Sequence, residues 1–221
     1  MKILHIDSSI LGDASVSRQL SAAIVAQLRA GRNDVEVTYR DVAANPLPHM
    51  SGEYFAASMA PEKDYSPALK AELAEGAVVL EEFLAADILV IGAGLYNFAV
   101  PSQLKAWLDR LVVVGKTFRF TPDGKSEGLV TGKRAILAVS RGGFYIGDSP
   151  MVSFEHTEGH LRSALGFLGV PSEAVTADGV ATGPDQRASA IRDAEARIAT
   201  LTVGLTVNKP PATGRQLCHI H

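Results

Sequence analysis

Apolar runs and amphipathic helical stretches alternate along most of this 221-residue chain, and this alternation limits the possible folds more than any other feature. Strands that alternate with helices pair in parallel, because each helix returns the chain to the same end of the sheet. We therefore predict an α/β fold with a parallel five-stranded sheet and helices on both faces. The predicted strands cover residues 2–7, 34–41, 87–92, 133–140 and 173–177, and the predicted helices cover residues 17–30, 67–85, 101–113, 153–168 and 184–204.

Four segments add detail to this pattern. Residues 34–41 alternate cleanly between apolar and polar side chains, which is typical of a strand at a sheet edge. Residues 116–132 indicate a hairpin or excursion, with an Asp-Gly turn signal. Residues 43–64 look like a long connection, and residues 205–221 show no clear periodicity. Because the sequence contains no repeat, low-complexity tract or linker, we expect one domain over residues 1–221.

Composition and charge limit the class of protein. The chain is 47% hydrophobic, which supplies enough apolar side chains for one sizeable core. Its net charge of −3 comes from 21 basic and 24 acidic residues, so no basic excess favours nucleic-acid binding. The single cysteine, Cys218, fits a reducing compartment. The sequence lacks a signal-peptide pattern and an apolar stretch of membrane-spanning length, so we expect a cytoplasmic protein with neither nucleic-acid nor membrane partners.

The predicted sheet indicates where a ligand would bind. In doubly wound sheets, ligands bind outside the carboxyl ends of the strands, where the strand order reverses. This rule selects the loops at residues 8–17, 93–101 and 140–150, and each of them has an unusual composition.

The first of these loops, residues 8–17, is rich in serine and is called the serine loop below. Ser9, Ser15 and Ser17 follow a buried strand and precede a helix, where hydroxyls and free backbone N–H groups can bind a phosphate. The loop lacks the glycine patterns of nucleoside-triphosphate and dinucleotide sites, which favours a single phosphomonoester. The alternative is that the serines only cap the helix and fill a turn.

The second loop combines apolar and aromatic residues around Asn97. Such a loop suits a flat ring, because side chains cover the faces of the ring while backbone and amide groups reach its polar edge. The alternative is that Tyr96 and Phe98 pack into the core while Pro101 begins a helix.

The third loop begins Ser140-Arg141-Gly142-Gly143. Two glycines after a buried strand let the backbone approach a ligand, so that their N–H groups can meet a developing negative charge. A glycine turn without a ligand is the alternative.

Taken together, the three loops resemble those of the FMN-dependent NADH–quinone oxidoreductases of the azoreductase family. The resemblance covers nearly the whole chain and is carried by Ser9, Ser15-Val16-Ser17, Tyr96-Asn97-Phe98, the block from Pro101 to Asp109, Lys116-Thr117-Phe118-Arg119 and Ser140-Arg141-Gly142-Gly143. It implies a flavodoxin-like doubly wound sheet, a bound FMN, NADH or NADPH as co-substrate, and a homodimer with active sites completed across the subunit interface. One departure is that Gly94-Leu95 stand where members of the family usually have Pro-Met.

The resemblance also implies roles for individual residues. The implied ligands of the FMN phosphate are Ser9, Ser15, Val16 and Ser17. The implied neighbours of the flavin ring are Leu95, Tyr96, Asn97 and Phe98, with Ser140, Arg141, Gly142 and Gly143 on its other side. For three aromatic residues, two positions stay open, either in the wall of the substrate site or in the core or dimer interface: Phe120, Tyr145 and Phe154. For four residues of the long connection, two positions also stay open, either over the flavin of a partner subunit or packed within their own subunit: Met50, Tyr54, Phe55 and Met59.

The function implied by the resemblance is a two-electron ping-pong reaction. We expect NADH or NADPH to pass hydride to the flavin, which then reduces a flat quinone or azo compound. No side chain has to act as a nucleophile, and the N–H groups near Gly142 and Gly143 are candidates for supporting negative charge on the reduced ring. We expect no metal, because His156 and His160 lack the glutamate of the zinc-binding helix motif.

Two other functions stay open. A flavodoxin-like FMN electron carrier would share the cofactor site, although such carriers commonly use a strongly acidic surface and this chain has a net charge of only −3. A phosphoester hydrolase would use the serine loop to hold its substrate, although neither metal ligands nor an activated nucleophile are visible in the sequence.

Overall fold

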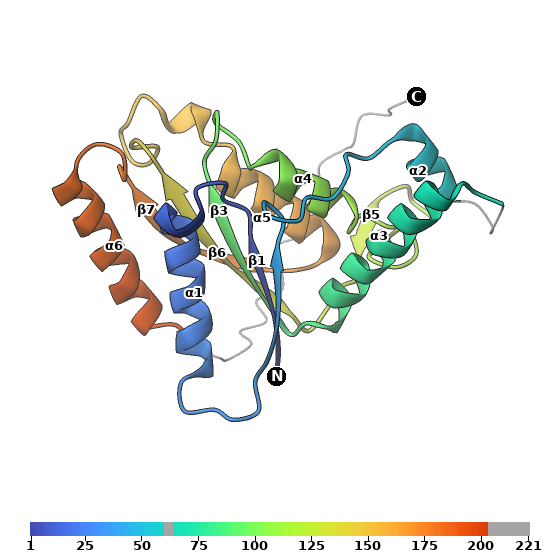
Figure 1. Cartoon of the computed structure of the whole chain (residues 1–221), viewed down its shortest axis with the longest axis horizontal. Coiled ribbons are helices and arrows are strands. Elements are labelled where there is room, and N and C mark those ends of the chain that lie inside the picture. Colours follow the sequence, from blue (N-terminus) through green and yellow to red (C-terminus); the bar gives the residue numbers. More distant parts are fainter. Residues whose placement is uncertain (60–63, 203–221) are drawn as a thin grey trace.

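The buried run that begins the chain forms a central strand of a parallel sheet, as its apolar sequence predicts. A computed structural model describes residues 1–59 and 64–202 (Figure 1). The sheet contains β1 (Lys2–Asp7), β2 (Glu36–Asp41), β3 (Ile88–Gly94), β6 (Arg134–Arg141) and β7 (Ser172–Asp178). The α-helices are α1 (Val16–Arg29), α2 (Gly52–Ser58), α3 (Pro67–Ala85), α4 (Ser102–Asp109), α5 (Thr157–Leu168) and α6 (Pro184–Ala199).

The strands lie in the order β2-β1-β3-β6-β7, and every neighbouring pair is parallel. This is the order 2-1-3-4-5 of flavodoxin-like sheets, so the predicted fold is confirmed. The strand order reverses between β1 and β3, because the chain adds β2 on one side of β1 and β3 on the other. The prediction of an edge strand over residues 34–41 is also confirmed, since β2 is the first strand of the sheet.

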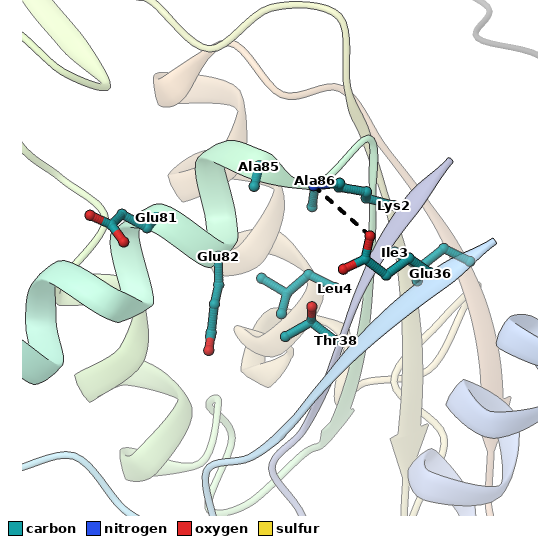
Figure 2. Close-up of a pocket in the computed structure, with 9 residues that line it drawn as sticks. All are labelled: Lys2, Ile3, Leu4, Glu36, Thr38, Glu81, Glu82, Ala85 and Ala86. Carbon is teal, nitrogen blue, oxygen red and sulfur yellow. Dashed lines mark ion pairs between the residues drawn. The ribbon is translucent and has the colours of Figure 1, made fainter. Parts of the chain in front are cut away.

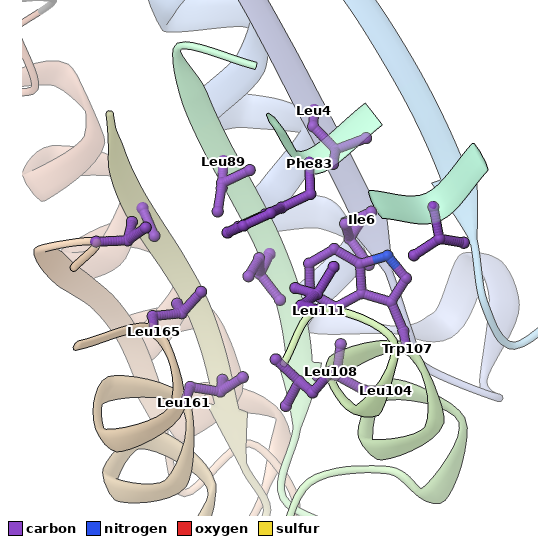
Figure 3. Close-up of a cluster of buried hydrophobic side chains, with 14 of the residues drawn as sticks. Leu4, Ile6, Phe83, Leu89, Leu104, Trp107, Leu108, Leu111, Leu161 and Leu165 are labelled. Carbon is purple, nitrogen blue, oxygen red and sulfur yellow. The ribbon is translucent and has the colours of Figure 1, made fainter. Parts of the chain in front are cut away.

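Alternate side chains of each strand pack on opposite faces of the sheet. On one face, α1 and α6 cover residues such as Ile3, Val90 and Ile136. On the other, α3, α4 and α5 enclose a larger cluster, in which the rings of Phe83 and Trp107 meet edge to face at 6.4 Å between centroids (Figure 3). These two packed layers give the loops at the carboxyl edge a rigid support.

Two predicted helices have different ends in the structure. The helix expected over residues 101–113 ends at Asp109, because the valine-rich run that follows disfavours helix. The helix expected over residues 153–168 begins at Thr157, because the preceding Glu155 carboxylate accepts a hydrogen bond from the N–H of Thr157 and fixes the start there.

The long connection over residues 43–64 contains the short helix α2, which Ser51 caps through a bond from the N–H of Tyr54. Tyr54 is buried against Leu69 of α3, and the guanidinium carbon of Arg110 lies 3.8 Å from the centre of its ring. Tyr54 therefore packs within its own subunit. The exposed residues of the same group are Met50, Phe55 and Met59.

The hairpin predicted within residues 116–132 is confirmed as β4 (Phe118–Phe120) and β5 (Ser126–Gly128), which pair antiparallel. Two short 3₁₀ turns, η1 (Gly12–Ala14) and η2 (Val152–Phe154), precede α1 and α5.

No helix in the described part of the chain is long and apolar enough to cross a membrane. The helix predicted over residues 184–204 ends at Ala199 in the structure. The tail 205–221, with Cys218, lies outside the described residues.

Candidate functional site

The three predicted loops adjoin one another because the strands that precede them, β1, β3 and β6, are neighbours in the sheet. The hydroxyl of Ser9 in the serine loop lies 2.7 Å from the hydroxyl of Tyr96 in the second loop. The N–H of Leu95 in the second loop donates to the carbonyl of Ser140 at 2.9 Å. The loops thus form one continuous surface at the carboxyl edge of the sheet, as predicted.

Ser9, Ser15 and Ser17 are all buried around the N-terminus of α1. The Ser15 hydroxyl accepts a bond from the N–H of Arg18, so the capping interpretation is confirmed for this residue. It also lies 3.1 Å from the hydroxyl of Ser17. Among the described residues, the N–H groups of Val16 and Ser17 find no hydrogen-bond acceptor. Two free N–H groups, serine hydroxyls and the positive end of α1 form a donor set that fits a phosphate.

The second loop is built on a strained turn. Tyr96 and Ala99 exchange both backbone hydrogen bonds, at 3.0 and 3.1 Å, around Asn97 and Phe98. These two residues have φ values of +47° and +74°, and no other non-glycine residue in the described chain has a positive φ. Asparagine tolerates this conformation, but for phenylalanine it costs about 1–2 kcal/mol. Strain of this kind clusters at ligand sites, and here the N–H groups of both residues lack partners in the part of the chain described.

Beside this turn lies a hollow of about 470 Å³, within the size range of small-molecule sites. It is lined by Ile10, Leu95, Tyr96, Asn97, Val100, Pro101, Ser102 and Gln103. The alternative that Phe98 packs into the core is wrong, because its side chain is 42% exposed and contacts the ring of Phe154. Five of these residues are not among the predicted site residues: Ile10, Val100, Pro101, Ser102 and Gln103. An isoleucine directly after Ser9, in a loop, is a signal that could have identified the first of them.

In the third loop, the carbonyls of Gly142 and Gly143 accept bonds from the N–H groups of Ala181 and Gly179, at 3.0 and 2.9 Å. The N–H groups of the two loop glycines donate no bond to any described residue. They are therefore available to a ligand, which is the property that the glycine pair predicted.

Arg141 differs from the other implied ring neighbours, because its side chain is 1% exposed and each of its three guanidinium nitrogens lies close to a carboxylate. Its Nη1 lies 3.1 Å from Asp178, its Nη2 2.7 Å from Glu158 and its Nε 3.3 Å from Glu155. Burial alone would raise the pKa of Glu158, but hydrogen bonds from Arg162 and Arg141 lower it below its usual range. The guanidinium thereby fastens the third loop to β7 and to the start of α5.

The three candidate substrate residues lie in different places. Phe154 contacts Phe98 with ring centroids 5.3 Å apart, so it borders the second loop. Tyr145 is half-buried in the third loop, with its ring against Gly143. Phe120 lies on the β4–β5 hairpin and is 63% exposed. A core position is therefore wrong for Phe120 and for the exposed Phe154.

A second hollow, of about 230 Å³, lies at the amino ends of β1 and β2 (Figure 2). Figure 2 shows Lys2 paired with Glu36 beside it, at 3.9 Å, while Glu81 and Glu82 project from α3. It shares no lining residue with the three loops and lies at the opposite end of β1 from the serine loop. By the strand-end rule, it is not the place where a ligand of this fold is expected.

The chain is similar to several known proteins. The model of a family with a flavodoxin-like fold matches residues 1–201. An FMN-dependent NADH:quinone oxidoreductase from Xanthomonas campestris pv. campestris is 53% identical over 204 residues, which cover 92% of this chain and 100% of the relative. A protein of the same name from Methylocella silvestris is 53% identical over 195 residues, covering 88% and 95%. The crystal structure of an azoreductase from Bacillus anthracis has a TM-score of 0.82 and 27% identity, with 90% and 97% covered.

Replacing one glycine of β3 tests how tightly this strand packs against the residues next to the serine loop. A Cβ at Gly92 would lie 2.6 Å from a carboxylate oxygen of Asp7 and 3.1 Å from the carbonyl of Ser17. We expect Gly92→Ala to lower the free energy of unfolding by about 1–3 kcal/mol in thermal melting. The control is Gly166→Ala in α5, where a Cβ meets nothing within 4 Å and should stabilise by about 0.5–1 kcal/mol. Equal melting temperatures for the two variants would contradict this packing.

Proposed function

We propose that this chain, which belongs to the family of FMN-dependent NADH:quinone oxidoreductases with a flavodoxin-like fold, binds one FMN at the three loops and reduces quinones or azo compounds with NADH or NADPH. One observation carries this proposal. Three neighbouring loops of the described chain each present backbone N–H groups without a partner, and these loops lie at one edge of the sheet. Buried backbone N–H groups in folded proteins are nearly always bonded, so the unpartnered N–H groups of the buried Val16 and Ser17 favour a ligand rich in hydrogen-bond acceptors.

The serine loop offers what a phosphate requires. Ser9, Ser15 and Ser17 would hold the phosphate of FMN, together with the N–H groups of the first turn of α1. Hydroxyls, amides and the helix dipole would therefore supply the binding energy.

The second loop offers what a flat ring requires. Asn97 and Phe98 would donate their N–H groups to the polar edge of the ring, beside the 470 Å³ hollow. Leu95 and Tyr96 line that hollow and would exclude water from one face of the ring.

When bound, FMN supplies the hydride and two-electron chemistry. The third loop's part is to stabilise charge. The N–H groups of Gly142 and Gly143 would donate to the side of the ring where negative charge develops, and a fixed donor of this kind is worth about 2.7–4 kcal/mol. Arg141 would position that pair of donors through its three carboxylate partners rather than touch the ring with its side chain.

We also propose that the chain is a homodimer, as the family resemblance implies, and that it works in the cytoplasm. The number of exposed apolar side chains on the loops supports the dimer, and two of them, Phe98 and Phe154, contact each other. These side chains are Ile10, Leu11, Phe98, Phe144, Ile146, Val152 and Phe154. Light scattering should give twice the 23.4 kDa mass of the chain.

The proposed activity is tested by the visible spectrum and by steady-state turnover. We expect a yellow protein whose flavin bleaches with NADH under anaerobic conditions, and which consumes NADH catalytically when menadione is added. An electron carrier would be yellow but would not sustain NADH consumption, and a phosphoester hydrolase would be colourless. Either of these outcomes would overturn the proposed activity.

A further inference from the structure

Arg18 occupies the first turn of α1, where a positive charge opposes the helix dipole. It is nevertheless held by an extensive set of hydrogen bonds. Its Nε and Nη2 donate to the carbonyl of Ser9 at 3.1 and 2.8 Å. Its Nη1 and Nη2 also form a two-point bond with the carboxylate of Asp41, at 2.6 and 2.9 Å.

The guanidinium has no donor left for a ligand. Arginine has five N–H groups in a fixed fork. Two reach Ser9, two reach Asp41, and the fifth reaches the hydroxyl of Tyr39 at 3.2 Å. A cation beside an anion site is commonly a ligand of the anion, but in this arrangement every donor of Arg18 is already used within the protein.

Asp41 is itself fixed, which makes it a firm anchor. Its Oδ1 accepts bonds from the N–H groups of Ala43 and Ala44, both at 3.0 Å, at the start of the connection after β2. Burial would raise the pKa of Asp41, but the bond from Arg18 and the two amide bonds lower it. The carboxylate therefore stays ionised at neutral pH, and the pair joins the end of β2 to the serine loop.

The bonds to Ser9 set the direction of the peptide that follows it. No peptide bond in the described chain is cis, so the N–H of Ile10 points away from the carbonyl of Ser9. Because Arg18 draws that carbonyl toward itself, the N–H of Ile10 is turned to the opposite side, where no described residue accepts it. The side chain of the same residue, Ile10, lines the 470 Å³ hollow.

We propose that Arg18 is a positioning residue for the serine loop. Its bonds to Asp41 and to the Ser9 carbonyl hold the loop in the shape that binds a phosphate, without contact between the guanidinium and the phosphate. This inference rests on the proposed FMN site and adds to it a residue that acts through the loop.

The test compares FMN with riboflavin, which has the same ring but no phosphate. Both flavins are titrated into the flavin-free full-length chain, and binding is followed by flavin fluorescence. We expect Arg18→Gln to raise the Kd of FMN about 10–100-fold, because a displaced loop loses about one hydrogen bond to the charged phosphate. The Kd of riboflavin should change much less, because Ile10 is the one residue of the serine loop that lines the hollow beside the ring. Asp41→Asn, which removes the anchor instead, should have the same selective effect.

Arg40 supplies a matched control. It lies next to Asp41 on β2, its side chain is 14% exposed against 17% for Arg18, and it makes a comparable two-point bond to Glu82, at 2.8 and 3.0 Å. Arg40→Gln should lower thermal stability by a similar amount while leaving the affinities for FMN and riboflavin unchanged.

Arg18→Lys separates positioning from direct contact. Lysine keeps the charge but loses the fork that bonds Ser9 and Asp41 together, so the preference for FMN over riboflavin should fall as it does in Arg18→Gln. A lysine variant that keeps the wild-type preference would overturn the positioning role, and so would equal weakening of both flavins. If the wild-type chain binds neither flavin, the proposed FMN site fails as well, which is a distinguishable result.

Discussion

Replacing Arg141 with methionine is expected to lower the free energy of unfolding by about 3–5 kcal/mol, because it leaves one buried and two partly buried carboxylates without this cation. Asp178 comes from the end of β7, and Glu155 and Glu158 come from the start of α5, so two separate segments of the chain meet at this guanidinium. For a chain of this size, the loss corresponds to a fall in Tm of roughly 6–20 °C. Thermal melting followed by circular dichroism measures it directly.

The neighbouring Arg162 is the control for this prediction. It also bonds Glu158, at 2.8 Å, but its side chain is 42% exposed and the pair lies within one helix. Exposed pairs of this kind contribute about 0–1 kcal/mol, so Arg162→Met should melt close to the wild type. Equal losses for the two variants would show that the cluster is not held by burial of Arg141.

The effect of Arg141 should also depend on pH. Because the folded-state pKa of Glu158 is lowered, its contribution to stability is present above its ordinary value of 4.5 and is lost as the pH falls through the lower folded value. The difference in stability between wild type and Arg141→Met should therefore shrink below about pH 4.5, since Glu158 of the variant is neutralised there. A difference that stays constant down to about pH 3 would exclude this electrostatic origin.

The elements that the sequence predicts well are those with a local physical cause. The first strand and the helix over 67–85 match the structure because continuous burial and a Ser-Pro helix start are visible within a few residues. The edge position of β2 was predictable because apolar and polar side chains alternate along residues 34–41. The helix α2 is harder to predict, because seven residues carry too little periodicity and its packing depends on Arg110, far away in the sequence.

The features that could not be predicted from the sequence depend on contacts between residues far apart in the chain. The composition of the three loops indicated a ligand-binding surface. The rule that ligands bind at the carboxyl ends of parallel strands predicted that these loops lie together. Nothing local indicates that Phe98 adopts a positive φ, since the residue opposes that conformation. The partners of Arg141 are 14, 17 and 37 residues away in the sequence, and Arg18 meets Asp41 across 23 residues. Such contacts follow from strand order, which periodicity does not determine.

The largest expected loss of cofactor affinity comes from the double substitution Ser15→Ala with Ser17→Ala. The two hydroxyls lie 3.1 Å apart beside the free N–H groups of α1, so both would donate to the same phosphate. Each bond to a charged group is worth about 1.5–3 kcal/mol, and losing two should raise the Kd of FMN by about 10²–10⁴-fold. Retention of FMN through gel filtration, with flavin fluorescence of the protein peak, measures this loss.

Ser66 separates the loss of a helix cap from the loss of a phosphate ligand. Its hydroxyl caps α3 by accepting a bond from the N–H of Leu69 at 3.2 Å, much as Ser15 caps α1 at 3.3 Å. Ser66→Ala should cost about 1 kcal/mol of stability, like the capping share of Ser15→Ala, and should leave FMN retention intact. If the double variant also kept its FMN, the hydroxyls of the serine loop would be caps and turn residues only, and the phosphate would have to bind elsewhere.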